Sequence, residues 1–214
     1  VALVTPMTES GDVDHVAFGR LLDWHARQGT DGIVIAGTTG ESPTVTAAEA
    51  AELLQIAVQR IGGRMPVIAG TGGNSTVESI ERTRAACELG VDGVLVVTPY
   101  YNRPPQEGLY RHFSLVADAS SVPLILYNVP SRTACDLLPE TVERVTAFAL
   151  GLDGGRIDLT HSAARWSGPA AFTEKIGENR ARFSIEAGIQ RSPRVQSSSS
   201  SELPRESRGL RAWP

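Results

Sequence analysis

The sequence reuses one supersecondary unit, and this repeat constrains the fold more than any other feature. The run Asp31-Gly32-Ile33-Val34-Ile35 returns as Asp92-Gly93-Val94-Leu95-Val96-Val97. Each run follows a helix-ending glycine, Gly29 or Gly90, by the same offset. A period of about 30 residues fits one strand plus one helix. We therefore expect a chain of repeated βα units.

Five such units can be traced in the first part of the chain. Strands are expected at residues 2–4, 33–36, 66–69, 92–97 and 122–127, and helices at about 14–28, 46–61, 75–89, 106–120 and from Pro139 onward. Thr46 with Glu49, and Ser75 with Glu78, have capping-box spacing. Continuously apolar strands that alternate with helices indicate a parallel sheet in an α/β fold. No Gly-x-Gly-x-x-Gly follows the first strand, so a barrel is favoured over an open dinucleotide-binding sheet.

The composition changes abruptly near Phe148. Residues 1–148 hold 18 valines, 10 arginines and no lysine, whereas the last 66 residues hold one valine, 9 arginines and the only lysine, Lys175. There are 10 basic and 17 acidic residues before this point and 10 and 7 after it, so the net charge changes from −7 to +3. We expect residues 1–148 to form the N-terminal part of a barrel. Residues 149–214 read as an aberrant tail, partly disordered, mainly from Ser192 onward.

Composition also argues against several classes of protein. A net charge of −4 without clustered Lys and Arg does not predict a nucleic-acid partner. No apolar run approaches the roughly 18 residues of a membrane span, and the chain starts at Val1, so we expect further residues before it in the natural protein. Two cysteines outside any Cys-x-x-Cys spacing favour the cytoplasm. No metal site is expected because no ligand pair forms among His15, His25, His112 and His161.

Chemistry-bearing side chains follow three of the expected strands, where a parallel barrel carries its active site. The second strand leads into Gly37-Thr38-Thr39-Gly40-Glu41-Ser42, whose hydroxyls and amides can bind a carboxylate or enolate oxygen, or simply form a turn. Tyr101 follows the fourth strand, and Tyr127 and Arg132 follow the fifth. The phenols can relay protons or pack at the rim, and Arg132 can clamp a carboxylate or remain a solvated charge.

Together with Val4-Thr5-Pro6-Met7, residues 67–72 and Leu137-Leu138-Pro139-Glu140-Thr141, these segments resemble the dihydrodipicolinate synthase family of pyruvate-dependent class I aldolases over residues 1–148. The resemblance implies a (β/α)8 TIM barrel assembled as a homotetramer, a dimer of dimers. It implies the condensation of pyruvate with aspartate 4-semialdehyde to 4-hydroxy-tetrahydrodipicolinate in lysine (diaminopimelate) biosynthesis, a lyase reaction without a cofactor.

The same resemblance implies roles for five residues. Thr38 and Tyr127 would form a proton relay that Tyr101 of a neighbouring subunit completes. Thr39 would bind the pyruvate carboxylate, and Arg132 would bind the carboxylate of the semialdehyde. Pyruvate must condense with an amine, lose water and lose a methyl proton, and each step needs a positioned acid or base.

The amine that this chemistry needs is missing where the family has it. The Schiff-base lysine should lie on the sixth strand, about 28 residues after Tyr127, and Gly155 occupies that place, in Leu152-Asp153-Gly154-Gly155-Arg156. Arginine cannot replace it because the guanidinium stays protonated, and Lys175 lies in a polar segment. The sixth, seventh and eighth strands are not recognisable after Phe148, which indicates a shifted reading frame.

We therefore expect an enzyme of lysine biosynthesis by descent, with its activity impaired. Two alternatives stay open. One is another pyruvate aldolase such as N-acetylneuraminate lyase, against which Arg132 argues by resemblance. The other is a non-catalytic truncated product that at most associates with intact barrel subunits.

Overall fold

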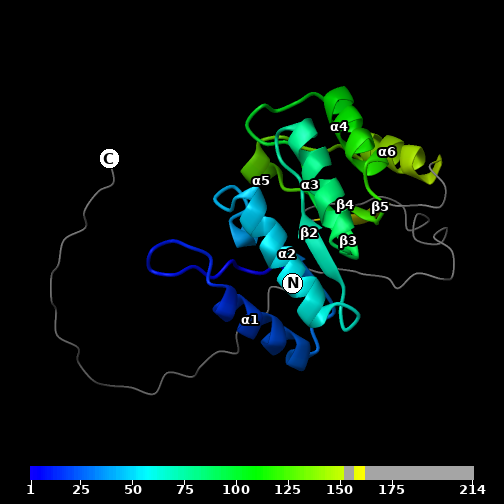
Figure 1. Ribbon diagram of the computed structural model, residues 1–214. Helices are drawn as coiled ribbons and strands as arrows, with labels where there is room; N and C mark the ends of the chain where they lie inside the picture. The colour runs from blue at the N-terminus through cyan, green and yellow to red at the C-terminus, as the bar shows by residue number, and fades with distance from the viewer. Residues whose placement is uncertain (152–156, 162–214) are drawn as a thin grey trace, which may run out of the picture.

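The computed structural model describes residues 1–151 and 157–161, in which strands alternate with helices (Figure 1). The strands are β1 Ile33–Ile35, β2 Val67–Gly70, β3 Gly93–Val97, β4 Leu124–Asn128 and β5 Ile157–His161. The main helices are α1 His15–Gln28, α2 Ala47–Ile61, α3 Thr76–Glu88, α4 Gln106–Asp118 and α6 Pro139–Gly151. Two short turns of helix, η1 Thr38–Gly40 and α5 Pro130–Thr133, were not expected from the sequence.

The strands form one parallel sheet whose spatial order is the order of the chain, β1-β2-β3-β4-β5. A doubly wound sheet reverses its strand order at a switch point, and this sheet does not. Consecutive helices are also neighbours, because α1 packs on α2, α2 on α3, α3 on α4 and α4 on α6. The chain therefore advances steadily around one axis, as in a TIM barrel.

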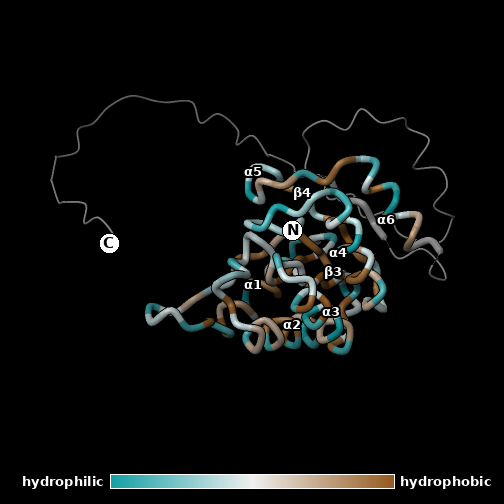
Figure 2. The backbone as a smooth tube through the Cα atoms, turned by 90° about the horizontal axis from the view of Figure 1, so that it is seen from above, coloured by the Kyte–Doolittle hydropathy of each residue, from teal (hydrophilic) through white to brown (hydrophobic). Residues whose placement is uncertain are grey.

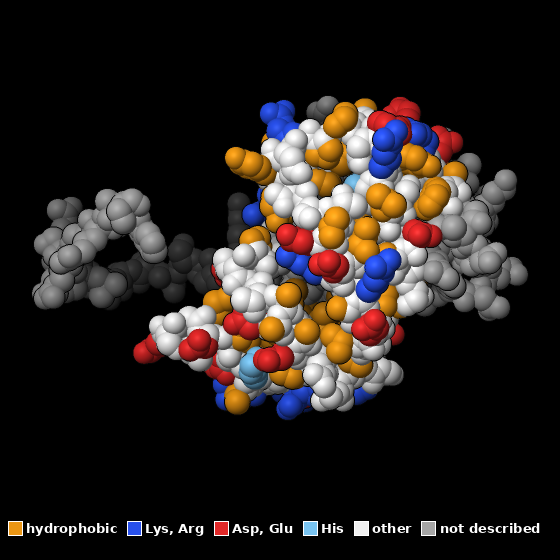
Figure 3. Space-filling view, turned by 45° about the horizontal axis from the view of Figure 1, so that its top comes forward, with side chains coloured by type: hydrophobic (Ala, Val, Ile, Leu, Met, Phe, Trp, Pro, Cys, Tyr) orange, Lys and Arg blue, Asp and Glu red, His pale blue; other side chains and the backbone are white. Residues whose placement is uncertain are grey.

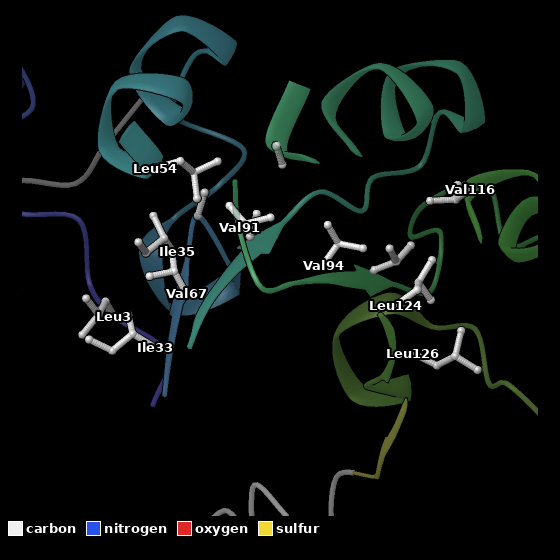
Figure 4. Close-up of a cluster of buried hydrophobic side chains, with 14 of the residues drawn as sticks. Leu3, Ile33, Ile35, Leu54, Val67, Val91, Val94, Val116, Leu124 and Leu126 are labelled. Atoms are coloured by element: carbon white, nitrogen blue, oxygen red, sulfur yellow. The ribbon is translucent and has the colours of Figure 1, made fainter. Parts of the chain in front are cut away.

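The two faces of the sheet are covered differently. Alternate strand residues such as Ile33, Ile35 and Val94 join the main core together with helix side chains such as Leu54 and Val116 (Figure 4). The residues between them form a second cluster, which in the described part of the chain consists of the strand residues Val34, Ile68 and Ile125 with Leu95. Helices on one face and an apolar opposite face are the arrangement of a barrel wall. Seen from above, the helices follow one another around the outside of the hydrophobic strands (Figure 2).

Helix starts follow the capping rules that the sequence indicates. At the start of α2, Glu49 N donates to Thr46 Oγ1 at 3.2 Å and Thr46 N donates to Glu49 Oε2 at 2.8 Å, a complete capping box. At α3 only half of the expected box forms. Glu78 N donates to Ser75 Oγ at 3.3 Å, while the Glu78 carboxylate pairs with Arg82.

Two expectations about strands are corrected. Residues 2–4 do not form a strand, and only a parallel bridge joins Ala2 to Val34, with Leu3 N donating to Val34 O at 2.9 Å. The chain still lies beside β1, as the barrel order requires. No strand was recognisable in the sequence after Phe148, but the structure has one there, because β5 pairs in parallel with β4 from Leu124↔Ile157 to Asn128↔His161. Polar Asp158 and Thr160 interrupt its apolar run, and an apolar run was the signal used to find the other strands.

Candidate active site

A pocket lies at the carboxyl ends of four successive strands. Its volume is about 230 Å³ when the open mouth is included. Because the carboxyl ends of parallel strands meet at one edge of the sheet, segments far apart in the sequence converge here. The lining residues are Ala36, Gly37, Thr38 and Ser42 after β1, Gly70 and Gly72 at the end of β2, Leu95 and Val97 of β3, and Tyr127 of β4.

Two glycines let the backbone form part of the pocket wall. A Cβ on Gly70 would overlap the carbonyl of Ala36, and a Cβ on Gly72 would overlap the backbone of Val96 and Val97. Neighbouring strand ends therefore approach more closely than any side chain would allow. This contribution to the pocket wall was not predicted from the sequence. The glycines themselves were the only signal.

The turn after β1 separates two threonines that the sequence grouped together. Ala36 has a positive φ of 53°, and the carbonyl of Gly37 accepts the amide of Gly40 at 3.0 Å. This tight turn places Thr38 in the pocket lining. Thr39 is exposed on the same turn and is not among the residues that line the pocket. The role of Thr39 stays a prediction.

Tyr127 is held at the pocket by its own backbone. It is level with Val97 of β3, and its carbonyl accepts both the amide of Thr98 at 2.9 Å and the Thr98 hydroxyl at 3.1 Å. Its half-buried side chain lines the pocket together with Thr38. A hydroxyl and a phenol that share one pocket can each donate and accept a proton. This pair is the part of the predicted relay that the structure brings together.

Tyr101 stands away from the pocket of its own chain. It is 91% exposed and has a positive φ of 70°, which is strained for an aromatic residue. Asn102 holds the loop. Its backbone N–H donates to Tyr100 O at 2.8 Å, and its side-chain Nδ2 donates to Asn74 O at 2.8 Å. A side chain held in solvent by a strained, anchored loop is available to a second molecule.

Arg132 lies at the rim on α5, after β4, and its side chain is exposed. Pro130 begins this four-residue helix, and Ala134 ends it with a positive φ of 52°. Arg132 does not line the pocket. It follows the same strand as Tyr127, which places it at the same end of the sheet.

The register of β5 gives a second candidate position for the missing lysine. Gly155, where counting places that lysine, lies outside the described residues, as does Lys175. The residue of β5 that is level with Tyr127 is Thr160. No lysine occurs in β5, whose sequence is Ile-Asp-Leu-Thr-His. The assignment of the missing lysine to position 155 stays a prediction.

The described part of the chain shows two further absences. Within residues 1–151 and 157–161, no group of three or more His, Cys, Asp and Glu side chains is placed to hold a metal ion. Over the same residues, none of the helices combines the length and the apolar character needed to cross a bilayer.

Sequential parallel strands, helices on one face and a pocket at the carboxyl ends define the chain as part of a TIM-barrel protein, with the pocket at the rim where such barrels carry their active sites. The profile of the Dihydrodipicolinate synthetase family matches residues 1–150. The chain belongs to this family.

Individual relatives agree with this assignment. The 4-hydroxy-tetrahydrodipicolinate synthase of Ectopseudomonas mendocina is 58% identical over 146 residues, which cover 68% of this chain and 50% of the relative. That of Alkalilimnicola ehrlichii is 57% identical over 194 residues, 89% of this chain and 64% of the relative. The chain thus spans about half the length of most of the curated relatives it matches.

Solved structures show the same fold. Dihydrodipicolinate synthase from Aquifex aeolicus superposes with a TM-score of 0.68 at 41% identity, over 75% of this chain and 61% of that one. The chloride-inhibited enzyme from Acinetobacter baumannii, complexed with pyruvate, also has a TM-score of 0.68, at 45% identity, over 74% of this chain and 54% of that one.

Proposed function

We propose that this chain carries the pyruvate-binding part of a 4-hydroxy-tetrahydrodipicolinate synthase. This lyase condenses pyruvate with aspartate 4-semialdehyde in lysine biosynthesis. The observation that carries the proposal is the meeting of Thr38 and Tyr127 in one small pocket at the barrel rim. A similar structure, from Acinetobacter baumannii, is complexed with pyruvate, which adds support.

In this proposal each rim residue has one task. Tyr127 passes protons to and from the pyruvate carbon skeleton, and Thr38 links Tyr127 to the next donor. Thr39 holds the pyruvate carboxylate, and Arg132 holds the carboxylate of the semialdehyde in a bidentate contact.

Tyr101 completes the relay from a second copy of the chain. Its 91% exposure and its strained, anchored loop support this assignment. The proposed assembly is therefore a homo-oligomer, with a tetramer built as a dimer of dimers. The two cysteines of the chain, Cys87 and Cys135, are free thiols, which supports a reducing compartment such as the cytoplasm.

The chain as it stands binds pyruvate without completing the reaction. A Schiff base forms when an amine attacks the ketone carbon of pyruvate and the carbonyl oxygen leaves as water. None of the five residues of β5 supplies that amine. The alternative of a non-catalytic product rests on this same observation.

One experiment separates these outcomes. The chain is incubated with pyruvate and borohydride, its intact mass is measured, and pyruvate binding is followed separately by NMR. We expect saturable pyruvate binding without a covalent mass increase. A borohydride-trapped adduct on Lys175 would show that this lysine serves as the amine, and the absence of any pyruvate binding would overturn the proposed function.

A further inference from the structure

The segment that follows α5 is fixed residue by residue to the start of α4 and to the end of β4. We call residues 134–138 the α5–α6 linker. Asp136 Oδ1 accepts Asn128 Nδ2 at 2.7 Å, and Leu137 N donates to Asn128 Oδ1 at 3.2 Å. The Cys135 thiol donates to Pro104 O at 3.5 Å, and burial raises the pKa of this thiol, which keeps the proton on sulfur.

Gln106 makes more of these contacts than any other side chain of α4. Its Nε2 donates to Asp136 O at 2.7 Å. Its Oε1 accepts Leu138 N at 3.2 Å and the Thr141 hydroxyl at 2.6 Å. One amide group at the first turn of α4 thus binds both the linker and the first turn of α6.

The position of α5 depends on this linker. A helix of four residues makes too few internal hydrogen bonds to be stable alone. Its first residues lack a side-chain cap, and its last turn ends at Ala134 in a strained αL conformation. Arg103 Nε donates to the carbonyl of Ala134 at 3.0 Å. From within the helix, Thr133 Oγ1 lies 2.8 Å from Cys135 O of the linker. The placement of α5, and of Arg132 on it, is therefore tied to the linker.

We propose that Gln106 is a positioning residue for Arg132. It acts through the α5–α6 linker and orients the guanidinium toward the carboxylate of an incoming aldehyde substrate. This inference rests on the proposed function. Residues 103–106, which hold the linker, directly follow the loop that presents Tyr101, so one short segment fixes two rim residues from different βα units.

The inference predicts a split between two ligands. Pyruvate binds in the pocket, whose lining includes neither Gln106 nor the linker. Loss of Gln106 should therefore weaken binding of an aldehyde carboxylate at Arg132 and spare pyruvate. A merely structural defect would weaken both.

The test measures two dissociation constants by NMR on the full chain. Pyruvate is one probe, and succinic semialdehyde, which carries one carboxylate and one aldehyde, is the other, followed at the Arg132 guanidinium with pyruvate present. For Gln106→Ala we expect semialdehyde binding weakened roughly tenfold, the equivalent of one ordinary hydrogen bond. Pyruvate binding should stay within about twofold of the parent chain.

Two further variants sharpen the result. Gln106→Glu keeps the acceptor for Leu138 N and Thr141 but loses the donor to Asp136 O, so it should give an intermediate semialdehyde affinity and also serves if the alanine variant does not fold. Gln59→Ala removes an exposed glutamine of α2 and should change neither constant.

The outcomes distinguish the two proposals. Equal semialdehyde affinity in Gln106→Ala and the parent overturns the positioning role and leaves the proposed function intact. A parallel loss of both ligands also overturns it. If the parent chain binds pyruvate but shows no saturable shift at Arg132, the proposed role of Arg132 fails, and this inference fails with it.

Discussion

His112 is a neutral histidine in the core, and its environment makes it sensitive to acid. It is buried between α3 and α4, where Thr76 Oγ1 lies 2.9 Å from its Nδ1. Burial lowers the pKa of His112 from 6.5 to about 4. The unfolded chain therefore takes up this proton before the folded chain does as the pH falls. The stability that neutral His112 gives is complete above about pH 6.5 and is lost progressively between pH 6.5 and about 4.

We predict that the free energy of unfolding falls by about 2 kcal/mol between pH 7 and pH 5 because of this one group. Urea denaturation of the parent and of His112→Gln at both pH values measures the effect, and the variant should lose most of the difference. His15→Gln, which changes an exposed histidine paired with Glu52, is the control. An equal pH dependence in parent and His112→Gln would contradict this assignment.

A substitution at Gly70 tests how closely the backbone packs at the pocket wall. In Gly70→Ala the new methyl group overlaps the Ala36 carbonyl, so strand ends must separate. We expect a loss of about 1–3 kcal/mol in unfolding free energy, the usual cost of overpacking, together with weaker pyruvate binding. Gly32→Ala is the matched control, because its nearest contact would be an ordinary 3.5 Å from Pro66 O. Similar losses in the two variants would show that Gly70 is not constrained by close approach.

At the scale of elements, the complete and the half-formed capping boxes should differ in strength. Thr46→Ala removes a hydroxyl that takes part in a reciprocal cap, and we expect it to cost about 1 kcal/mol. Ser75→Ala removes a single 3.3 Å contact and should cost less. Chemical denaturation of both variants under the same conditions checks the order. A larger loss for Ser75→Ala would contradict the argument.

The elements found from the sequence are those whose signals are local. The start of α2 follows from Thr46 and Glu49, and the apolar runs locate β1 to β4 within about two residues. β5 was not predicted, because polar residues alternate with apolar ones along it and its pairing partner, β4, lies in a distant segment. The four-residue α5 was not predicted because so short a helix shows no apolar periodicity in the sequence.

The residues of the candidate site also differ in how far local sequence predicts them. Thr38 and Tyr127 could be predicted to lie near one another, because each stands at the end of an apolar run and a parallel barrel brings such residues to one rim. Gly72 was missed because its place in the wall depends on how closely Val96 and Val97 approach, which no single segment reveals. Thr39 and Arg132 were expected beside the others, but the turn after β1 and the helix α5 carry them outside the pocket lining.

At the scale of the whole molecule, acidic and basic side chains are interspersed over the face shown in Figure 3. Exposed pairs such as Arg60 with Asp23 add little stability. Stability therefore depends mainly on the core and on how the sheet edges are satisfied.

A parallel sheet that stays open at both edges should associate with other chains or unfold gradually. In the described residues, β5 has a partner only on the β4 side, and β1 has beyond it only the bridge at Ala2. Unpaired backbone edges promote association between chains. We predict concentration-dependent association in light scattering and a broad thermal transition in calorimetry. A monodisperse sample with one sharp transition would contradict this, and would show that the rest of the chain covers these edges.

Lysine substitutions at two positions can test where in the barrel wall the missing amine belongs. An attacking amine must sit on a rigid strand close to the substrate carbonyl, and a displacement of about 1 Å can cost on the order of a hundredfold in rate. Gly155 precedes β5, whereas Thr160 is level with Tyr127 in the parallel register. We predict that Gly155→Lys alone gives no borohydride-trapped pyruvate adduct and no condensation with aspartate 4-semialdehyde.

Thr160→Lys should form the Schiff base with pyruvate more readily than Gly155→Lys, because it places an amine at the level of the candidate pocket. We expect a trapped adduct, measured as a mass increase that maps to residue 160, while overall condensation still fails without a replaced tail. The comparison includes a chain whose segment after Phe148 is exchanged for a family sequence. If Gly155→Lys traps pyruvate as well as that exchanged chain does, the register of β5 against β4 is not the one that functions, and the amine belongs at the position that counting along the sequence indicated.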